Sequence, residues 1–523
     1  MRARLTGRTD EYGIRGLTVR AVLFKGIGEL IPLYALYAVL FADHGLSTGQ
    51  ISSLLAIWSA TAFLLEVPSG AWADTVSRRG LLVSSGVLLT AGFTLWTVLP
   101  TYLGFALGFL LWGTSGALVS GTFEALLYDE LVAHGARQAY PQLIGYARAA
   151  SEAAIVIAIV AATPLYVWGG YPLLGWSSVL FAAVHTLIAL SLPSAPKAVS
   201  AAAVEELEDD AVAGDSSSGQ QPAGGTRVAA DVTAAARRAR VLGPAGQSDE
   251  DGSINSSIAR QRADSADPAT SIGPVARKST LPRLIPTEHE GCDDRAPAAA
   301  GGTATSDCDE SVSRPFVTYL SMLRTGVGEA IRVRAVRNGV MLGALLFGIT
   351  AFDEYFALLA AEVGVATAIV PLLVGITVLG SLIGSVLAGR TEAISARTMA
   401  RAVGIAGVLF VGGALISGLA VRWPAAVYVL AVLGFTAIGA SYGIIYNATV
   451  VAGARLQDAI EGPARATVTS VSGLASEVVA LAVFGFTAVA TLWFSMSTTV
   501  ALLGTLLLAI ALLTPSWLPQ RPN

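Results

Sequence analysis

The stretch EVPSGAWADTVSRRG, residues 66–80, separates two long apolar runs of the sequence. The run before it begins near Ile51, and the run after it begins at Leu81. Within the stretch, Asp74 and Arg78 stand four residues apart, which is the spacing at which side chains on one helix face meet. If the flanking runs cross a membrane, the stretch forms a tight charged turn at the membrane surface.

The composition is that of an integral membrane protein. Hydrophobic residues make up 54% of the 523 residues and charged residues only 13%, whereas soluble domains carry about 25% charged residues. No basic patch is interleaved with aromatic residues, which argues against nucleic-acid binding. The two cysteines, Cys292 and Cys308, lie in a polar region and suggest neither a disulfide framework nor a metal site. We expect no cofactor.

Twelve apolar runs of about 20 residues, long enough to span a membrane as helices, occur in two groups of six. The sequence therefore predicts an all-α membrane protein with twelve transmembrane helices in two halves, residues 20–192 and 335–513. The halves are nearly equal in length, which suggests an ancestral duplication. The predicted spans are residues 20–42, 49–73, 80–100, 102–127, 146–167 and 172–192, then 338–361, 366–389, 398–420, 424–447, 466–490 and 492–513.

Charges in the predicted loops orient these spans. Arginines after spans two, four, eight and ten fall on one side, together with the basic N-terminal tail, residues 1–19. The opposite loops carry almost no Lys or Arg, with Arg422 as the exception. By the positive-inside rule both termini, including the tail 514–523, are predicted to be cytoplasmic. We expect a multi-pass protein of the plasma membrane.

Residues 193–315, between the halves, have a different composition. They are rich in Ala, Ser, Gly and Asp and have no sustained apolar period, so they are predicted to form a long disordered cytoplasmic linker. A regulatory or docking segment, phosphorylated on its serines, is the functional alternative. Apolar residues then recur at helical spacing over 316–334, which predicts an amphipathic helix on the inner membrane surface.

The opening stretch resembles the signature between the second and third spans of the major facilitator superfamily. That signature is Gly, three residues, Asp, three residues and two basic residues, which Gly70, Asp74, Arg78 and Arg79 match. The resemblance implies that this turn stabilises the inward-closed state. It also implies that Gly70 lets span two approach span eleven, and that Asp74 and Arg78 join an acid at the end of span four, which is Asp129 here. The alternative is a surface ion pair worth under about 1 kcal/mol.

A partial copy of the signature follows span eight. Gly384 and Arg390 keep the glycine and one base, but Ala388 stands at the place of the aspartate.

Charged side chains inside the spans are candidates for proton or substrate sites, because each costs about 2.5 to 3.5 kcal/mol at the bilayer centre. Lys25 precedes Glu29 by four residues, and Arg148 precedes Glu152 by four, so each pair could neutralise itself on one helix. Partners on neighbouring helices are an equal alternative. The full set is Lys25, Glu29, Glu66, Glu124, Arg148, Glu152, Asp353, Glu354 and Glu477.

Three of these carboxyls lie in the second half. Glu477 lies near the middle of span eleven with no basic residue within a helical turn, which suits a proton carrier. The alternative is a carboxyl bonded to a hydroxyl such as that of Ser470 or Ser472. Asp353 and Glu354 lie in the outer half of span seven, where adjacent residues point about 100° apart. At most one of them should face a central cavity, and either could instead bind a cationic substrate or reach the outer headgroups.

Aromatic residues are plentiful in the spans. Aromatic walls with scattered carboxylates resemble the cavities of drug-efflux members of the superfamily, where stacking and charge hold large cations. The antiporter signature of span five, Gly-Pro followed by Gly-Gly, is absent from residues 146–155. The aromatic candidates for a central pathway are Tyr34, Tyr37, Trp58, Trp112, Phe123, Phe352, Phe356, Phe435, Tyr442 and Tyr446.

These features together predict a monomeric, proton-coupled exporter of small amphipathic molecules that works by rocking its halves about a central site. Two alternatives are proton-coupled uptake of a nutrient or metabolite and a transport-dead membrane sensor or scaffold acting through its linker. An enzyme is disfavoured, because the four histidines are scattered and no His-Glu-x-x-His pattern occurs.

Overall fold

The computed structural model describes residues 2–194, 196–197, 332–460 and 465–520, with no side-chain description before residue 13 or at residues 67, 71, 465–467 and 470. Within these ranges the chain forms helices and turns and no strand. The predicted linker, 193–315, and the predicted surface helix, 316–334, lie almost wholly outside them.

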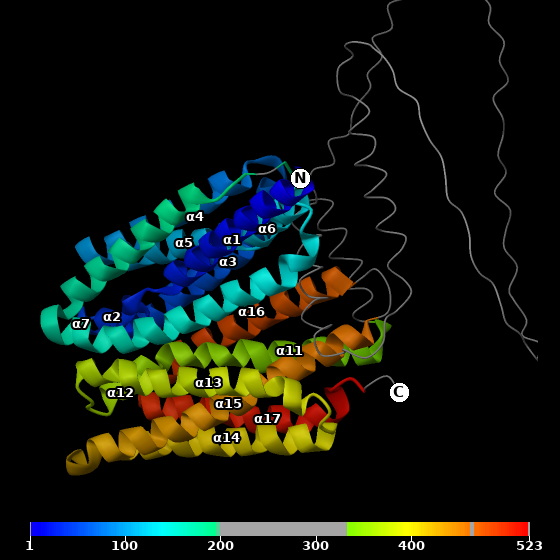
Figure 1. Cartoon of the computed structure of the whole chain (residues 1–523). Helices are drawn as coiled ribbons and strands as arrows, with labels where there is room; N and C mark the ends of the chain where they lie inside the picture. Colours follow the sequence, from blue (N-terminus) through cyan, green and yellow to red (C-terminus); the bar gives the residue numbers. More distant parts are fainter. Residues whose placement is uncertain (1, 195, 198–331, 461–464, 521–523) are drawn as a thin grey trace, which may run out of the picture. The chain divides into compact units, whose positions relative to one another are not determined.

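The N-terminal half contains two spans that are broken and one helix that supplies two spans (Figure 1). Span one is divided by a 3-10 helix, and span four changes direction at Gly121, whose φ is 67°. The 52-residue helix α7 reverses at Gly170, where φ is 60°, a conformation that glycine adopts without strain. The elements are α1 (Arg2–Glu29), η1 (Pro32–Ala35), α2 (Tyr37–Asp43), α3 (Thr48–Thr75), α4 (Arg78–Val98), α5 (Tyr102–Val119), α6 (Thr122–Ala133), η2 (Arg137–Ala139) and α7 (Tyr140–Ser191).

The C-terminal half also has six spans, of which the first is divided by the 3-10 helix η3. The eleven stretches of the described chain that are long and apolar enough to cross a membrane include Arg137–Ser191, which holds two spans, so the twelve predicted spans are confirmed. The elements are α11 (Arg334–Gly348), η3 (Ile349–Tyr355), α12 (Phe356–Glu362), η4 (Thr367–Ile369), α13 (Val370–Thr391), α14 (Ala396–Leu419), η5 (Pro424–Ala426), α15 (Val427–Ala459), α16 (Arg465–Ala490) and α17 (Met496–Trp517).

The helices run between two ends of the bundle. We call one the Asp74 end; it carries the turns 76–77, 134–139 and 392–395, and the chain termini lie on the same side (Figure 1). We call the other the His44 end; it carries the turns 44–47, 99–101 and 491–495. Serine side chains accept a hydrogen bond from the third helical residue in the turns before α3, α4, α14 and α17, which fixes where these helices begin.

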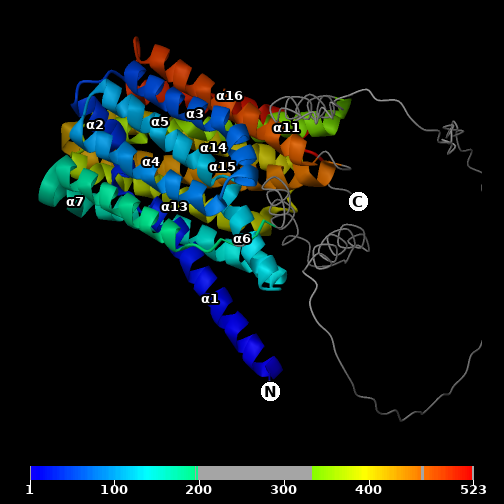
Figure 2. The ribbon, with the colours of Figure 1, turned by 90° about the horizontal axis from the view of Figure 1, so that it is seen from above.

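Helix contacts within the C-terminal half depend on small residues. Gly380 and Gly384 of α13 lie directly against Gly439 and Gly443 of α15, so closely that a Cβ atom at Gly384 would overlap the Gly443 carbonyl. Such stripes of small residues let the backbones of membrane helices approach closely. Between the halves, α3 lies beside α16 and α7 beside α13 (Figure 2).

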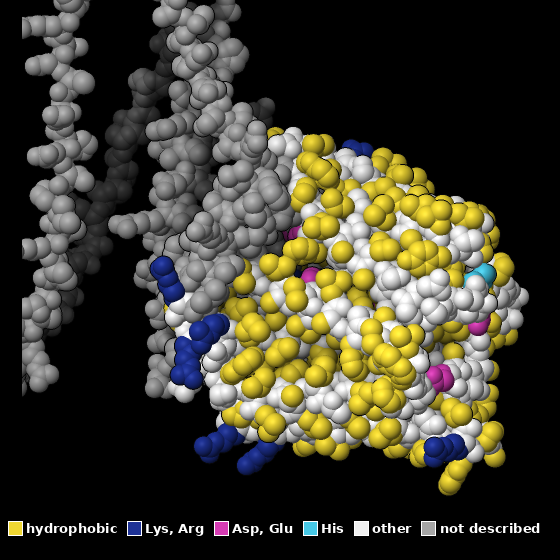
Figure 3. All heavy atoms as spheres, turned by 180° about the vertical axis from the view of Figure 1, so that it is seen from behind, with side chains coloured by type: hydrophobic (Ala, Val, Ile, Leu, Met, Phe, Trp, Pro, Cys, Tyr) yellow, Lys and Arg dark blue, Asp and Glu magenta, His cyan; other side chains and the backbone are white. Residues whose placement is uncertain are grey.

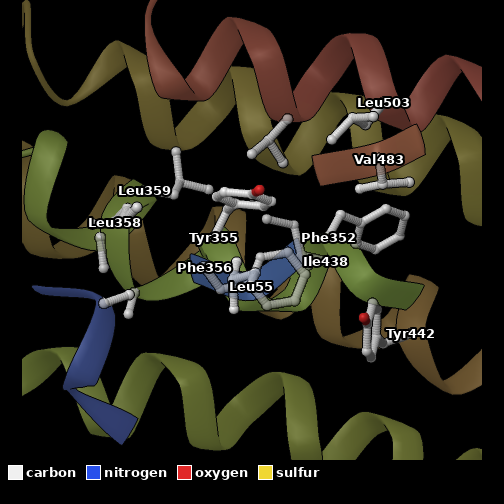
Figure 4. Close-up of a cluster of buried hydrophobic side chains, with 14 of the residues drawn as sticks. Leu55, Phe352, Tyr355, Phe356, Leu358, Leu359, Ile438, Tyr442, Val483 and Leu503 are labelled. Atoms are coloured by element: carbon white, nitrogen blue, oxygen red, sulfur yellow. The ribbon is translucent and has the colours of Figure 1, made fainter. Parts of the chain in front are cut away.

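The described residues of the two halves share a hydrophobic core at the His44 end. There Leu55 of α3 joins Phe352, Tyr355 and Phe356 of the other half in one continuous cluster (Figure 4). At the Asp74 end the described first-half residues form a separate cluster around Phe123, whereas the second half contributes Met399 and Val451 of the large cluster and the small cluster around Val468. Among the described residues the halves therefore share a core at one end and have separate cores at the other.

The outer surface is suited to lipid. Apolar side chains cover most of the described face in Figure 3, and many exposed leucines, valines and isoleucines lie on the spanning helices. In water such surface would be unfavourable, whereas the hydrocarbon core of a bilayer solvates it.

Candidate functional site

A cavity of about 870 Å³ lies between the two halves. Its walls come from α1, η1, α4, α5, α6 and α7 of the first half and from α11 and α15 of the second. The second half contributes Phe347, Tyr446, Thr449 and Val450, none of which is charged. The charged residues that line the cavity all come from the first half, and all were predicted: Lys25, Glu29, Glu124, Arg148 and Glu152.

Lys25 pairs across helices. Its Nζ lies 3.5 Å from Oε1 of Glu124 and 4.9 Å from the centre of the Phe123 ring. Glu124 stands in the first turn of α6, where the helix dipole favours a negative charge. Of the two alternatives for Lys25, the partner on a neighbouring helix is therefore present instead of Glu29.

Glu29 is the last residue of α1, and its side chain is half-buried in the cavity wall. Among the described residues it has no hydrogen bond and no ion pair within 4.0 Å, although it lies near enough to Lys25 and Glu152 to feel their charges. Arg148 and Glu152 stand one turn apart on α7 and both line the cavity. Five predicted charges thus converge on one space.

Aromatic rings form another part of the wall. Tyr34 and Trp112 both line the cavity and stack with their ring centres 4.9 Å apart and their planes 14° apart. Behind them lie Phe93 and Phe109, which are fully buried and contact Trp112 at 6.0 and 5.8 Å. These rings are held in place by packing from behind.

His185 also lines the cavity, although no role was predicted for it. Its ring lies 4.2 Å from that of Phe24, and its Nδ1 lies 2.9 Å from the Phe24 carbonyl oxygen. Because that oxygen can only accept, Nδ1 carries the proton in this contact. The feature of the sequence that could have indicated His185 was its position as a single histidine inside an otherwise apolar span.

The three carboxyls of the second half lie outside the cavity lining. Glu477 Oε2 accepts a hydrogen bond of 2.5 Å from the hydroxyl of Ser59 on α3. The alternative of a hydroxyl-bonded carboxyl is therefore realised, but the hydroxyl belongs to the other half. It is not that of Ser472, and the Ser470 side chain is outside the described part. Sequence reasoning missed Ser59, because a single serine in an apolar span gives no sign of its partner.

Asp353 and Glu354 lie on η3, where the sequence predicts a continuous helix. The Tyr37 hydroxyl of the first half donates a hydrogen bond to Glu354, and the next residue, Tyr355, lies 2.7 Å from the hydroxyl of Ser52. Both acidic side chains are half-buried inside the protein. Neither lines the cavity, and Glu354 joins the halves at the His44 end.

The signature turn forms a buried ion pair at the Asp74 end. Arg78 Nη1 lies 2.5 Å from Asp129 Oδ2, and both side chains are only 3% exposed. Asp74 lies 3.5 Å from Arg78 and is 40% exposed. Arg79 donates to the carbonyl of Leu190 at the end of α7. The alternative of a weak surface ion pair therefore applies only to Asp74, because the side chains of Arg78 and Asp129 are buried.

The approach of Gly70 to α16 stays a prediction. A Cβ atom at Gly70 would meet no atom of the described chain within 4 Å, and the side chains of residues 465–467 and 470 of α16 lie outside the described part. The two helices meet toward the His44 end, where Ser59 contacts Glu477 and Gly49 faces the backbone of Ala488.

In the second half the corresponding turn, residues 392–395, is held by a base from span ten instead of an acid. Arg455, near the end of α15, donates to the carbonyl oxygens of Glu392 at 2.9 Å and Ile394 at 2.5 Å. Span ten thus supplies a base, where span four supplies the acid Asp129. This arrangement accounts for the loss of the aspartate at Ala388, because the turn is held through its backbone.

Two six-helix halves that meet at one end and enclose a charged cavity define the fold of a secondary transporter. The family model for the Major Facilitator Superfamily matches residues 21–458. The chain belongs to this family and is a multi-pass membrane transporter, in a family of carriers and not of enzymes.

Solved structures agree in fold. The chain is similar to the crystal structure of the nucleoside transporter NupG, with 11% identity and a TM-score of 0.54, over 97% of this chain and 99% of that chain. A point mutant of NupG gives 10% identity, a TM-score of 0.55 and the same coverage. A D-xylose-proton symporter gives 15% identity and a TM-score of 0.49, over 97% and 98%. No curated protein matches the sequence. At these identities the likeness concerns the fold alone.

Proposed function

We propose that this protein exports small amphipathic molecules from the cytoplasm in exchange for protons, by alternating access of the central cavity. The observation that carries the proposal is the division of the hydrophobic core. The halves share one core at the His44 end and have separate cores at the Asp74 end, while the cavity lies between them. Such a molecule opens its cavity toward one side of the membrane and can rock to open it toward the other.

The distribution of charge supports a cytoplasmic Asp74 end in the plasma membrane. The turns of this end and the helix starts next to them carry Arg78, Arg79, Arg137 and Arg397, whereas Arg422 stands almost alone among the described bases of the His44 end. In Figure 3, most of the visible Lys and Arg side chains lie on the left, which is the Asp74 end of the bundle in this view. The positive-inside rule then places both termini in the cytoplasm and makes this conformation inward-open.

The cavity suits a small solute. Its volume falls within the range of about 300 to 1,000 Å³ of small-molecule sites, and it combines charged side chains with the stacked rings of Tyr34 and Trp112. Charged groups inside membrane spans are costly and are characteristic of substrate and ion pathways. The exported class is therefore a molecule with apolar and polar parts.

Proton coupling is assigned to carboxyls that join the halves. Ser59 donates to Glu477, and Tyr37 donates to Glu354, in both cases across the boundary between the halves. An ionised carboxyl accepts such hydrogen bonds strongly, and protonation removes this charge-assisted strength. Uptake of a proton at Glu477 would thus weaken the closed His44 end and link protonation to opening.

The test is a panel of amphipathic compounds in proteoliposomes with an imposed pH gradient. We expect gradient-driven transport by the wild-type protein. Glu477→Gln should reduce it at least about tenfold, and Asp458→Asn, an exposed acid outside the cavity lining, should leave it unchanged. Movement of substrate together with protons would establish symport and contradict export by exchange. Absence of flux for every compound, with the protein folded, would favour the sensor or scaffold.

A further inference from the structure

Helix α3 carries a polar stripe along the boundary between the halves. Ser52, Ser59 and Glu66 stand seven residues apart, so they follow one face of the helix over about four turns. Ser59 contacts Glu477 of α16, and Ser52 contacts Tyr355 of η3, so this face is turned toward the second half. None of these residues lines the cavity. The stripe is therefore a second polar feature between the halves, distinct from the cavity.

Apolar side chains interrupt the stripe between its two contacts. Leu55 follows Ser52 on α3, and Val483 and Phe484 follow Glu477 on α16. These three apolar side chains are at most 3% exposed and belong to the shared core at the His44 end, where Figure 4 shows Leu55 and Val483. Apolar packing of this kind excludes water. It separates Glu477 from the His44 end in this conformation.

Glu66 lies on the other side of Glu477, toward the Asp74 end. It stands about two turns beyond Ser59 on α3, is exposed, and lies near enough to Glu477 for the charges of the two carboxyls to interact. Helical side chains lean toward the N-terminus of their helix, which here is toward Ser59 and Glu477. A carboxyl that combines exposure with this proximity can exchange a proton both with water and with Glu477.

The backbone next to Glu66 favours water. Pro68 lies inside α3 and has no N–H group, so the carbonyl oxygen of Leu64 lacks its helical donor. The Ser69 hydroxyl donates to the carbonyl oxygen of Glu66 at 2.7 Å. Carbonyl groups that proline frees in membrane helices are commonly satisfied by water. The helix thus provides polar groups that can hold water beside the exposed carboxyl.

The surroundings of the two carboxyls leave them as the titratable pair of the stripe. Glu477 is the group whose charge acts on Glu66. Helix α5, which packs against α3, and helix α17, which packs against α16, carry no Asp, Glu, Lys or Arg. The charged residues of the other elements packed against α3 and α16 stand near helix ends or on η3: Asp43, Arg78, Arg79, Glu124, Asp129, Glu130, Arg334, Arg337, Asp353 and Glu354.

We propose that Glu66 is the proton-exchange residue of the Asp74 side, which transfers a proton between Glu477 and water along the boundary of α3 and α16 and not through the cavity. The proposal rests on the proposed function for the coupling role of Glu477. In the release direction the O–H bond of protonated Glu477 breaks, and the proton moves through intervening water to form an O–H bond with the Glu66 carboxylate. Glu66 then gives the proton to bulk water. One proton leaves, both carboxyls end ionised, and the substrate cavity takes no part.

The test follows the protonation of Glu477 itself. The full-length protein in phosphatidylcholine nanodiscs is subjected to a rapid rise of pH, and the carbonyl-stretching infrared band of its protonated carboxyls is recorded with time. The part of the band that Glu477→Gln removes in each background belongs to Glu477. We expect Glu66→Gln to slow the loss of this part at least about tenfold, although the loss still goes to completion. Glu66→Asp, which keeps a carboxyl, should retain most of the wild-type rate.

Two further variants control for the route. Glu152→Gln removes a carboxyl of the cavity wall, and Asp458→Asn removes an exposed acid outside the cavity lining. Both should leave the rate of proton loss from Glu477 unchanged. Slowing by Glu152→Gln instead of Glu66→Gln would place the route in the cavity and overturn the proposal. Thermal unfolding confirms that each variant is folded, and Glu66→Ala replaces Glu66→Gln if the latter does not fold.

The outcomes distinguish this proposal from the proposed function. An unchanged rate in Glu66→Gln would overturn the proton transfer through Glu66 even if flux in proteoliposomes is intact. Slowing that depends on Glu66, without flux for any compound, would support the proton transfer and contradict transport. In an active transporter, Glu66→Gln should lower gradient-driven flux but preserve the exchange of labelled for unlabelled substrate, which needs no net proton transfer. A merely structural role of Glu66 would lower both.

Discussion

The most enclosed charges of the described chain are Arg78 and Asp129 of the signature turn. Each is 3% exposed, and Arg78 also donates to the carbonyl of Ala125. A buried pair is a weak source of net stability, but loss of one partner leaves the other charge buried and unpaired. Asp74, at 40% exposed and 3.5 Å from Arg78, lies in a setting where an ion pair contributes little. The turn thus separates a structural pair from an exposed third charge.

Asp129→Asn should therefore act mainly on stability, and Asp74→Asn mainly on transport. The first should destabilise the folded protein by about 3 to 5 kcal/mol, because Arg78 keeps its buried charge. The second should cost under about 1 kcal/mol and should abolish transport, because the signature implies a gating role for Asp74. Thermal unfolding in detergent and flux in proteoliposomes measure the two effects. Wild-type flux in Asp74→Asn would remove the gating role.

The sequence predicted which charged side chains line the cavity better than it predicted which side chains they contact. All five charges of the cavity were candidates from the sequence alone, because a charge inside an apolar span is costly and is typical of a substrate or ion pathway. Lys25 stands four residues before Glu29 in the sequence, yet it pairs with Glu124 on α6, and Glu477 bonds to Ser59 418 residues away. Such partners depend on how helices pack, which no local spacing encodes.

Among the described glycines, Gly384 of α13 makes the closest approach to another helix, the backbone of α15 at Gly443. A Cβ atom at Gly384 would lie 1.8 Å from the carbonyl oxygen of Gly443, whereas one at Gly389, five residues further along the same helix, would meet nothing within 4 Å. The partial copy of the signature in the second half thus keeps its glycine for packing. The stripe on α13 leaves no room for a larger residue.

Gly384→Leu should accordingly prevent normal folding, and Gly389→Leu should be tolerated. The clash at Gly384 is with backbone, which cannot move away as a flexible side chain can, so the two helices would have to separate. Yield of monodisperse protein and its unfolding temperature provide the measurement. Equal yield and stability of the two variants would show that α13 and α15 are not packed as described.

The pairing of α3 with α16 gives a second prediction for helices. A Cβ atom at Gly70 would meet no described atom within 4 Å, and the proposed closure of the Asp74 end would bring α3 toward α16 at that point. Gly70→Leu should therefore leave the unfolding temperature unchanged and reduce flux at least about tenfold. Gly412→Leu, also without neighbours within 4 Å, is the matched control. Normal flux in Gly70→Leu would mean that the helices do not close there.

Periodicity and length predicted the spans but not their interruptions. The run that was expected to be one helix over 338–361 is divided by η3, and Gly121 breaks the fourth span just before Glu124. These breaks place Glu354 against the first half and Glu124 at a helix start, so they matter for the site. A hydrophobic run looks the same whether its backbone is α-helical or 3-10.

For the whole molecule, the sequence determined the family and the two-half plan but not the conformation. The signature turn and twelve spans were sufficient for the fold. A transporter has at least two conformations for one sequence, so the separate cores around Phe123 and in the second half could be known only from the structure.

The central claim is that the joined His44 end opens during transport. Gly49 of α3 and Ala488 of α16 face each other there, with 3.9 Å between a Cβ atom at Gly49 and the Ala488 carbonyl. Both residues are replaced by cysteine in a chain whose Cys292 and Cys308 are changed to serine, and a short reducible cross-linker joins them. We predict that cross-linking stops gradient-driven flux and that reduction restores it, while either single cysteine variant is unaffected. Full flux in completely cross-linked protein would contradict alternating access between these two halves.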